Sequence, residues 1–175
     1  PADLPNPLGV YGQSKLAGEA AIRDCMPGQS LIVRTSWLYA AAGKNFVTTM
    51  LRLMQAKHEI SVVVDQVGSP TWAAGLARCV WEMLEKDVRG VYHWSDAGVA
   101  SWYDFAVAIQ EEALAVGLLE QEKPIRPIIA AEFPSLAKRP AYSVLNTSET
   151  WRELEYTAPH WRRNLRHMLQ ELCHA

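Results

Sequence analysis

The sequence lacks any apolar run long enough to span a lipid bilayer, because charged or polar residues interrupt every hydrophobic stretch. It also lacks, at its start, the basic segment followed by an apolar segment that marks a secretory signal. Its net charge is only −2, which gives no electrostatic reason to bind nucleic acid or an anionic membrane. We therefore expect a cytoplasmic protein with no nucleic-acid partner and no membrane partner.

Cysteine is scarce and widely spaced. The three cysteines are Cys25, Cys79 and Cys173, an odd number that suits a reducing compartment better than a disulfide framework. None has a metal-ligand neighbour at close spacing, and the five histidines do not cluster. The sequence therefore predicts no metal site.

A glycine-rich phosphate-binding turn is also missing. Dinucleotide-binding folds place such a turn after their first strand, so that the backbone can approach the pyrophosphate. The ten glycines are dispersed along the chain, and none of them forms a Gly-x-x-Gly-x-x-Gly pattern. Any dinucleotide site within this sequence is therefore expected to be incomplete.

What is present indicates one globular α/β domain over residues 1–175. Hydrophobic residues make up 49% of the chain and charged residues 21%, which is typical of a folded protein. Apolar periodicity predicts helices and strands in alternation, with a looser last third forming a small lobe. The expected helices cover 9–23, 45–55, 73–86, 102–116 and roughly 159–172, and the expected strands cover 30–39, 59–65, 90–94 and 125–129.

Three local details accompany this pattern. Thr71 is expected to cap the helix over 73–86, and Ser101 to cap the helix over 102–116 with Asp104 completing a capping box. In the first helix, Leu16, Ala20 and Ala21 are expected to point towards a core.

Tyr11 and Lys15 lie four residues apart at the start of the first expected helix, so their side chains share one face. A phenol normally titrates near 10, and a neighbouring ammonium favours the phenolate and lowers that pKa. Such a tyrosine can exchange a proton with the oxygen of a carbonyl group. The same spacing is also common by chance in exposed helical pairs, so the pair alone leaves both interpretations open.

The surrounding motifs resemble a known family. The segment PLGVYGQSKLAGE is followed in order by RTSWLY, GKNFVTTMLRL, DQVGSPT, GVYHWSDAGVASWYDFA and AKRPAYSVLNT. This order resembles the dTDP-4-dehydrorhamnose reductase family, in the sugar-nucleotide branch of the extended short-chain dehydrogenase/reductases. The resemblance covers nearly all of the chain. It implies the carboxyl-terminal part of a Rossmann-type fold with a small α/β substrate-binding lobe.

The resemblance also implies an activity and site residues. The family reduces dTDP-4-dehydro-L-rhamnose to dTDP-L-rhamnose with NADPH or NADH. By this resemblance, Tyr11 and Lys15 are expected to be both catalytic and cofactor-binding. Trp37 follows an expected strand and is implied to pack against the substrate sugar, although an aromatic residue there also suits a core. Gln66 lies in the loop after the expected strand over 59–65 and is the candidate ligand contact of that loop.

Asn45 and Arg139 are the remaining implied contacts with the dTDP-sugar. Asn45 precedes a helix, so it serves equally well as an N-cap or as a ligand for the nucleotide diphosphate. Arg139 lies in the segment AKRPAYS, where its guanidinium fork suits a diphosphate better than a solvated surface position.

The missing glycine turn limits what the chain is expected to do alone. Three explanations stay open: a piece of a complete reductase, a naturally shortened protein, or one chain of a two-chain enzyme. In each case we expect no independent reductase activity, and either homo-oligomerisation or a partner chain that supplies the missing half. The alternatives are a non-catalytic sugar-nucleotide-binding or regulatory subunit on the same scaffold, and another sugar-nucleotide epimerase or dehydratase.

Overall fold

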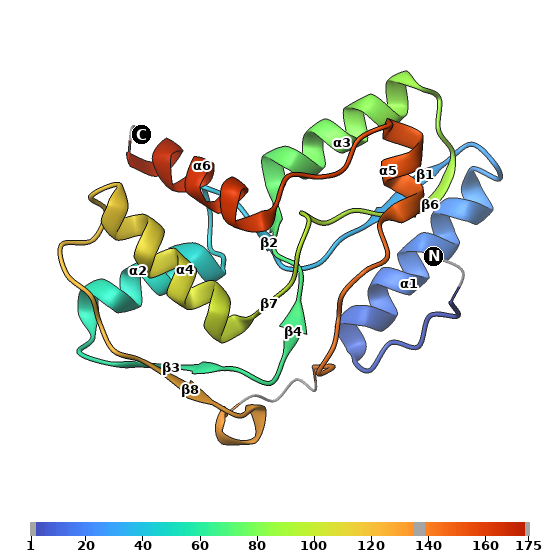
Figure 1. Cartoon of the computed structure of the whole chain (residues 1–175). Coiled ribbons are helices and arrows are strands. Elements are labelled where there is room, and N and C mark those ends of the chain that lie inside the picture. The colour runs from blue at the N-terminus through green and yellow to red at the C-terminus, as the bar shows by residue number, and fades with distance from the viewer. Residues whose placement is uncertain (1–2, 135–138, 174–175) are drawn as a thin grey trace.

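In the computed structural model, which describes residues 3–134 and 139–173, helices alternate with short paired strands (Figure 1). The helices are α1 (Val10–Cys25), α2 (Phe46–Ala56), α3 (Ala73–Glu85), α4 (Trp102–Ala115), η1 (Ala130–Glu132), α5 (Ser148–Leu154) and α6 (Trp161–Cys173). The strands are β1 (Leu31–Arg34), β2 (Leu38–Tyr39), β3 (Ile60–Val63), β4 (Val67–Gly68), β5 (Thr71–Trp72), β6 (Gly90–His93), β7 (Ala100–Ser101) and β8 (Ile125–Ile128).

The strands associate in pairs. The pairs β1–β6, β2–β5 and β3–β8 are parallel, and β4–β7 is antiparallel. Parallel pairs joined through helices confirm the α/β class. The single strand expected over 30–39 is wrong in one respect. It is divided into β1 and β2, because Trp37 adopts a φ of 48°, far from extended backbone.

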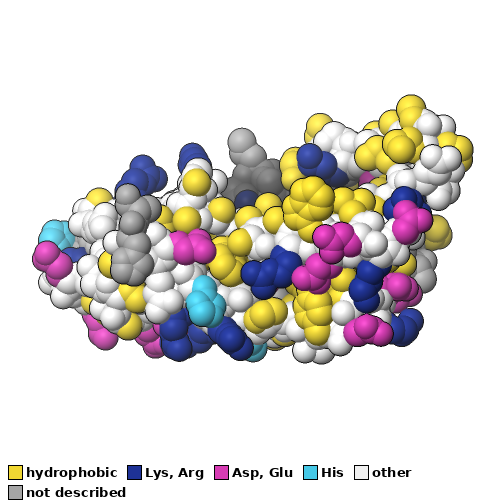
Figure 2. Space-filling view, turned by 90° about the horizontal axis from the view of Figure 1, so that it is seen from above, with side chains coloured by type: hydrophobic (Ala, Val, Ile, Leu, Met, Phe, Trp, Pro, Cys, Tyr) yellow, Lys and Arg dark blue, Asp and Glu magenta, His cyan; other side chains and the backbone are white. Residues whose placement is uncertain are grey.

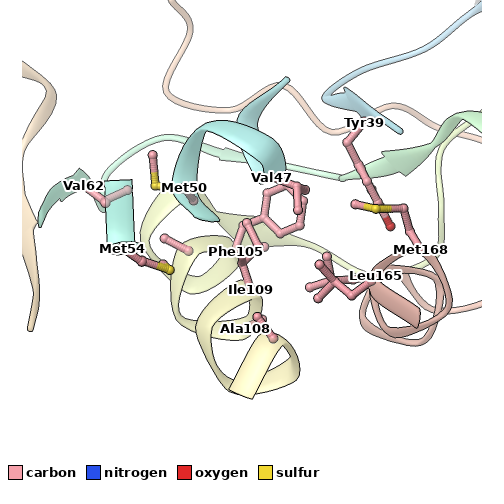
Figure 3. Close-up of a cluster of buried hydrophobic side chains, with 14 of the residues drawn as sticks. Tyr39, Val47, Met50, Met54, Val62, Phe105, Ala108, Ile109, Leu165 and Met168 are labelled. Atoms are coloured by element: carbon pink, nitrogen blue, oxygen red, sulfur yellow. The ribbon is translucent and has the colours of Figure 1, made fainter. Parts of the chain in front are cut away.

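The larger hydrophobic core lies between α2, α4 and α6, on the side of the molecule that also carries β3 (Figures 1 and 3). Helical spacing places apolar side chains of α2 and α4 on facing sides, and α6 closes the far side of α4. The labelled side chains of Figure 3 converge on this core: Tyr39, Val47, Met50, Met54, Val62, Phe105, Ala108, Ile109, Leu165 and Met168.

A second, smaller core lies between α3, α5 and the β1–β6 pair, at the other end of the molecule (Figure 1). Its most buried side chains are those of Cys79, Met83 and Trp94. The sequence pattern does not predict α5. Leu154, at the end of that helix, belongs to this core, so the short helix is stabilised mainly by packing against α3 and β6.

Two of the expected helix caps can be compared directly. Ser101 caps α4 in a reciprocal capping box with Asp104, as predicted. The cap assigned to Thr71 is wrong. The N-cap of α3 is Trp72, whereas Thr71 lies in β5 opposite Leu38. The backbone N–H of Thr71 donates instead to the carbonyl oxygen of Trp37, at 3.1 Å.

Helix α1 has no buried residue. Leu16 is partly buried, but Ala20 and Ala21 are exposed, so the core contact predicted for those two alanines is wrong. Within the described residues, no apolar surface packs against the side of α1 that carries Ala20 and Ala21. The apolar side of the helix therefore has no packing partner among the described residues.

Candidate active site

The proposed proton-transfer pair lies in the first turns of α1. Gly9 is the extended N-cap residue, and Gly12 lies so close to Pro7 that a Cβ atom there would be 2.9 Å from the Pro7 Cβ. Tyr11 is 77% exposed, and the Nζ atom of Lys15 lies 5.3 Å from the centre of its ring. The two side chains therefore share one face of the helix, and the phenol is accessible to a ligand.

An ion pair holds α1 against β1. The guanidinium of Arg34 donates two hydrogen bonds to the carboxylate of Glu19, both at 2.7 Å. These hydrogen bonds lower the pKa of Glu19 below its ordinary value, with a smaller contribution from Arg23. Arg34 ends the strand that leads into the RTSW segment, so this contact places the tyrosine helix beside that segment.

The DQVGSPT loop organises the RTSW segment. The Ser36 hydroxyl donates to the carbonyl oxygen of Ser69 at 3.0 Å, and the Ser69 hydroxyl donates to the carbonyl oxygen of Gly98 at 2.8 Å. Together with the bond from Thr71 to Trp37, these contacts fix the course of residues 36–38 on the loop.

The same loop also receives the segment that carries Arg139. The N–H of Val67 donates to the carbonyl oxygen of Ala141 at 2.8 Å, and the N–H of Ser143 donates to that of Val67 at 2.9 Å. This pairing brings Arg139 close to Gln66. Ala137 and Lys138 of the AKRPAYS motif lie outside the described residues.

These contacts produce a cavity of about 440 Å³, which we call the tyrosine pocket. It brings together four of the six predicted site residues, which come from distant parts of the sequence. Lys15 is not among its lining residues. The lining residues that matter here are Tyr11, Thr35, Trp37, Gln66, Trp102 and Arg139.

Asn45 does not line this pocket. Its side chain is engaged at both ends of the amide: the Oδ1 atom accepts from the N–H of Thr48 at 3.2 Å, and the Nδ2 atom donates to the carbonyl oxygen of Ala40 at 2.8 Å. The residue forms a capping box with Thr48 at the start of α2. Of the two roles proposed for Asn45, the structure displays the N-cap, and the diphosphate contact stays a prediction.

A second cavity of about 750 Å³, the apolar pocket, adjoins the first. Gln66, Trp102 and Arg139 line both cavities. Most other lining side chains are apolar, including Phe46 and Phe133. The sequence motifs do not single out Trp102, which directly follows the buried Ser101 cap and is itself partly buried against the larger core.

Elsewhere in residues 3–134 and 139–173, a larger hollow of about 820 Å³ lies at α3 and α6 and includes none of the predicted site residues. In those residues we find no helix long and apolar enough to cross a membrane, and no group of three side chains suited to holding a metal ion.

The residues present fit a dinucleotide only in part. Tyr11 and Lys15 suit the nicotinamide end. The glycines with positive φ are isolated in separate turns, however, and so form no pyrophosphate cradle: Gly28, Gly43, Gly90, Gly98 and Gly117. The described residues therefore form only part of a dinucleotide site.

Parallel strand pairs joined through helices, with a Tyr-x-x-x-Lys helix at the edge of the tyrosine pocket, define part of a Rossmann-type fold. More particularly, the chain belongs to the RmlD substrate binding domain family, which matches residues 1–174.

Relatives support this assignment over almost the whole chain. The chain is 38% identical to the dTDP-4-dehydrorhamnose reductase of Salmonella typhimurium, covering 97% of this chain and 58% of the relative. It is 43% identical to the spore coat polysaccharide biosynthesis protein SpsK of Bacillus subtilis, covering 95% and 56% respectively. The chain thus spans somewhat more than half the length of these relatives.

A solved structure gives the same result in three dimensions. The dTDP-4-dehydrorhamnose reductase of Bacillus anthracis, solved in complex with NADP, superposes with a TM-score of 0.88 at 36% identity. The match covers 97% of this chain and 58% of that enzyme. The arrangement of elements described above is therefore also that of the matched part of the Bacillus anthracis enzyme.

Proposed function

We propose that this chain forms the substrate-binding lobe and the proton-donating helix of an enzyme that reduces a 4-keto sugar carried on deoxythymidine diphosphate. One observation carries the proposal: Tyr11, Trp37, Gln66 and Arg139 line a single cavity. An acid for the carbonyl oxygen, an aromatic face for the pyranose and a cation for the diphosphate thus meet at one place.

Each of the two adjoining cavities is proposed to hold a different part of the dTDP-sugar. The apolar pocket suits the flat base and the deoxyribose, because the aromatic side chains of Phe46, Trp102 and Phe133 line it. Arg139, at the junction of the two pockets, suits the diphosphate. The sugar then extends into the tyrosine pocket, where its 4-keto group faces Tyr11.

In the proposed reaction Tyr11 donates its phenolic proton to the carbonyl oxygen of the sugar, and Lys15 stabilises the phenolate that remains. NADPH or NADH, when bound, supplies the hydride to the carbonyl carbon. Because the described residues form no pyrophosphate cradle, we propose that the isolated chain binds the nucleotide sugar and does not reduce it. Tight binding of NADPH by the isolated chain in a calorimetric titration would contradict the proposal that this chain lacks a complete cofactor site.

Calorimetric titration with dTDP-L-rhamnose tests the proposed substrate site, with Arg139→Ala and Arg52→Ala as matched variants. Arg52 lies exposed on α2 and lines neither pocket. Loss of a charge-assisted contact to the diphosphate is expected to weaken binding about tenfold in Arg139→Ala. Arg52→Ala is expected to bind like the wild type. Equal affinities in all three proteins would exclude the diphosphate role, and an absence of binding by the wild type would exclude the substrate site.

A further inference from the structure

Two stacked indole rings lie where the tyrosine pocket and the apolar pocket adjoin. Trp37 and Trp102 stack with their ring centres 3.5 Å apart and their planes 5° from parallel. Trp102 lines both cavities, whereas Trp37 lines only the tyrosine pocket. The position of the Trp37 ring therefore sets the shape of one wall of the tyrosine pocket.

The backbone of Trp37 is held in an unfavourable conformation. Its φ of 48° lies in the left-handed region, which residues with a Cβ rarely adopt. Such a conformation persists only where surrounding contacts impose it. Here the hydrogen bonds from Thr71 to the Trp37 carbonyl and from Ser36 to Ser69 hold the segment on the DQVGSPT loop.

The same loop makes room for the indole at Gly68. A Cβ atom built on Gly68 would lie 2.5 Å from Cε2, 2.6 Å from Nε1 and 2.8 Å from Cζ2 of Trp37. Gly68 is buried and is not among the glycines with positive φ, so its backbone does not itself require glycine. The requirement is for space, because any larger residue would occupy the volume of the indole.

From this geometry we infer that Gly68 is a positioning residue. It seats the Trp37 indole in the stack with Trp102, and so sets the sugar-facing wall of the tyrosine pocket. The role of that wall in sugar binding rests on the proposed function, whereas the seating of the ring does not. The DQVGSPT loop thus shapes the tyrosine pocket in two ways: Gly68 positions the Trp37 ring, and Gln66 lines the pocket itself.

Circular dichroism tests the seating of the ring directly. Two indoles stacked this closely couple their electronic transitions, so their joint ultraviolet signal differs from the sum of two separate rings. Trp37→Phe and Trp102→Phe each remove one partner and identify the signal. We expect Gly68→Ala to lose the signal as these variants do, and the matched variant Gly18→Ala to keep it, because a Cβ on Gly18 meets nothing within 4 Å. Retention of the full signal in Gly68→Ala would overturn the inference.

A double substitution distinguishes a displaced ring from general damage to the fold. Overpacking at Gly68 is expected to lower the midpoint of thermal unfolding by about 3 °C or more. In a Trp37→Leu background the clash with the indole is absent, so Gly68→Ala is expected to cost much less. An equal loss in both backgrounds would show that Gly68 acts on something other than Trp37.

Ligand titration then separates this inference from the proposed function. Gly68→Ala is expected to bind dTDP-L-rhamnose about tenfold more weakly, while its affinity for dTDP stays within about twofold of the wild type. Equal weakening for both ligands would overturn the assignment of the wall to the sugar. If the wild type binds neither ligand, the proposed function fails, while the dichroism result still decides the role of Gly68.

Discussion

Asp96 is almost completely buried beside the start of α3, with an exposure of only 1%. Its Oδ2 atom accepts a hydrogen bond from the N–H of Trp72 at 3.2 Å, and its Oδ1 atom has no hydrogen-bond partner among the described residues. Burial raises the pKa of this carboxyl to about 7. The Asn164 side chain and the Trp72 N–H favour the charged carboxylate and so limit this rise. At the scale of single residues, Asp96 is therefore the clearest source of pH-dependent stability.

We expect Asp96→Asn to remove this dependence. A raised pKa means that the folded state binds the proton more tightly than the unfolded state. The wild type therefore loses stability as pH rises from about 4 to about 7, by a few kcal/mol in total. The asparagine variant keeps the acceptor for Trp72 and has no charge to bury. Urea unfolding of both proteins between pH 4 and pH 8 measures the difference, and parallel stability curves would contradict it.

At the scale of elements, α1 depends on one ion pair for its position. Glu19 and Arg34 join α1 to β1, and both side chains are largely shielded from solvent, at 14% and 24% exposure. Because α1 has no buried residue, little apolar packing supports this contact. The helix that carries Tyr11 is therefore expected to open more readily than α2 or α4.

We expect Glu19→Gln to loosen α1 selectively. Loss of the charge removes about 1 kcal/mol, an amount that allows for partial screening by solvent, so amide hydrogens of α1 exchange about fivefold faster. Because the pKa of Glu19 is lowered in the folded state, the wild-type contact is intact above the ordinary glutamate value. It weakens as pH falls through the lowered value.

Hydrogen exchange followed by mass spectrometry measures this effect, with Glu85→Gln, an exposed glutamate at the end of α3, as the control. Unchanged exchange in α1 of Glu19→Gln would show that the ion pair does not hold the helix.

At the scale of the whole molecule, apolar side chains remain uncovered at one end. Six large hydrophobic side chains in or next to α1 are exposed, with Leu4 at 93% and Val10 at 81%; the others are Leu8, Tyr11, Ile22 and Met26. The space-filling view shows hydrophobic side chains gathered towards the right-hand end, where Figure 1 places α1 and the β1–β6 pair (Figures 1 and 2). Such a surface is typical of an interface with further protein.

We expect the wild-type chain to self-associate in solution through this surface, unless a partner chain covers it. Sedimentation velocity over a range of concentrations measures the association. Val10→Lys combined with Ile22→Lys places charges on the exposed side of α1 and is expected to shift the protein towards monomer. A wild type that sediments as a single monomeric species at all concentrations would contradict the prediction.

The extent to which the sequence predicted the structure differs between elements. The helices agree closely with prediction, because their amphipathic spacing and end signals act within one or two turns. The short helix α5 and the pair β4–β7 were missed, since each depends on contacts with distant residues more than on local preference. The break at Trp37 was also missed. A strand-like run of apolar residues gives no sign that the DQVGSPT loop imposes a positive φ on one of them.

The sequence by itself determined the α/β alternation, the capping box at Ser101 and the shared helix face of Tyr11 and Lys15. Each of these depends on residues a few positions apart, whose geometry the backbone sets directly. Only the tertiary structure decided that Trp102 joins Trp37 at the tyrosine pocket, and that Gly68 leaves space for the indole. Close packing between distant segments specifies those contacts, and the order of residues along the chain does not record it.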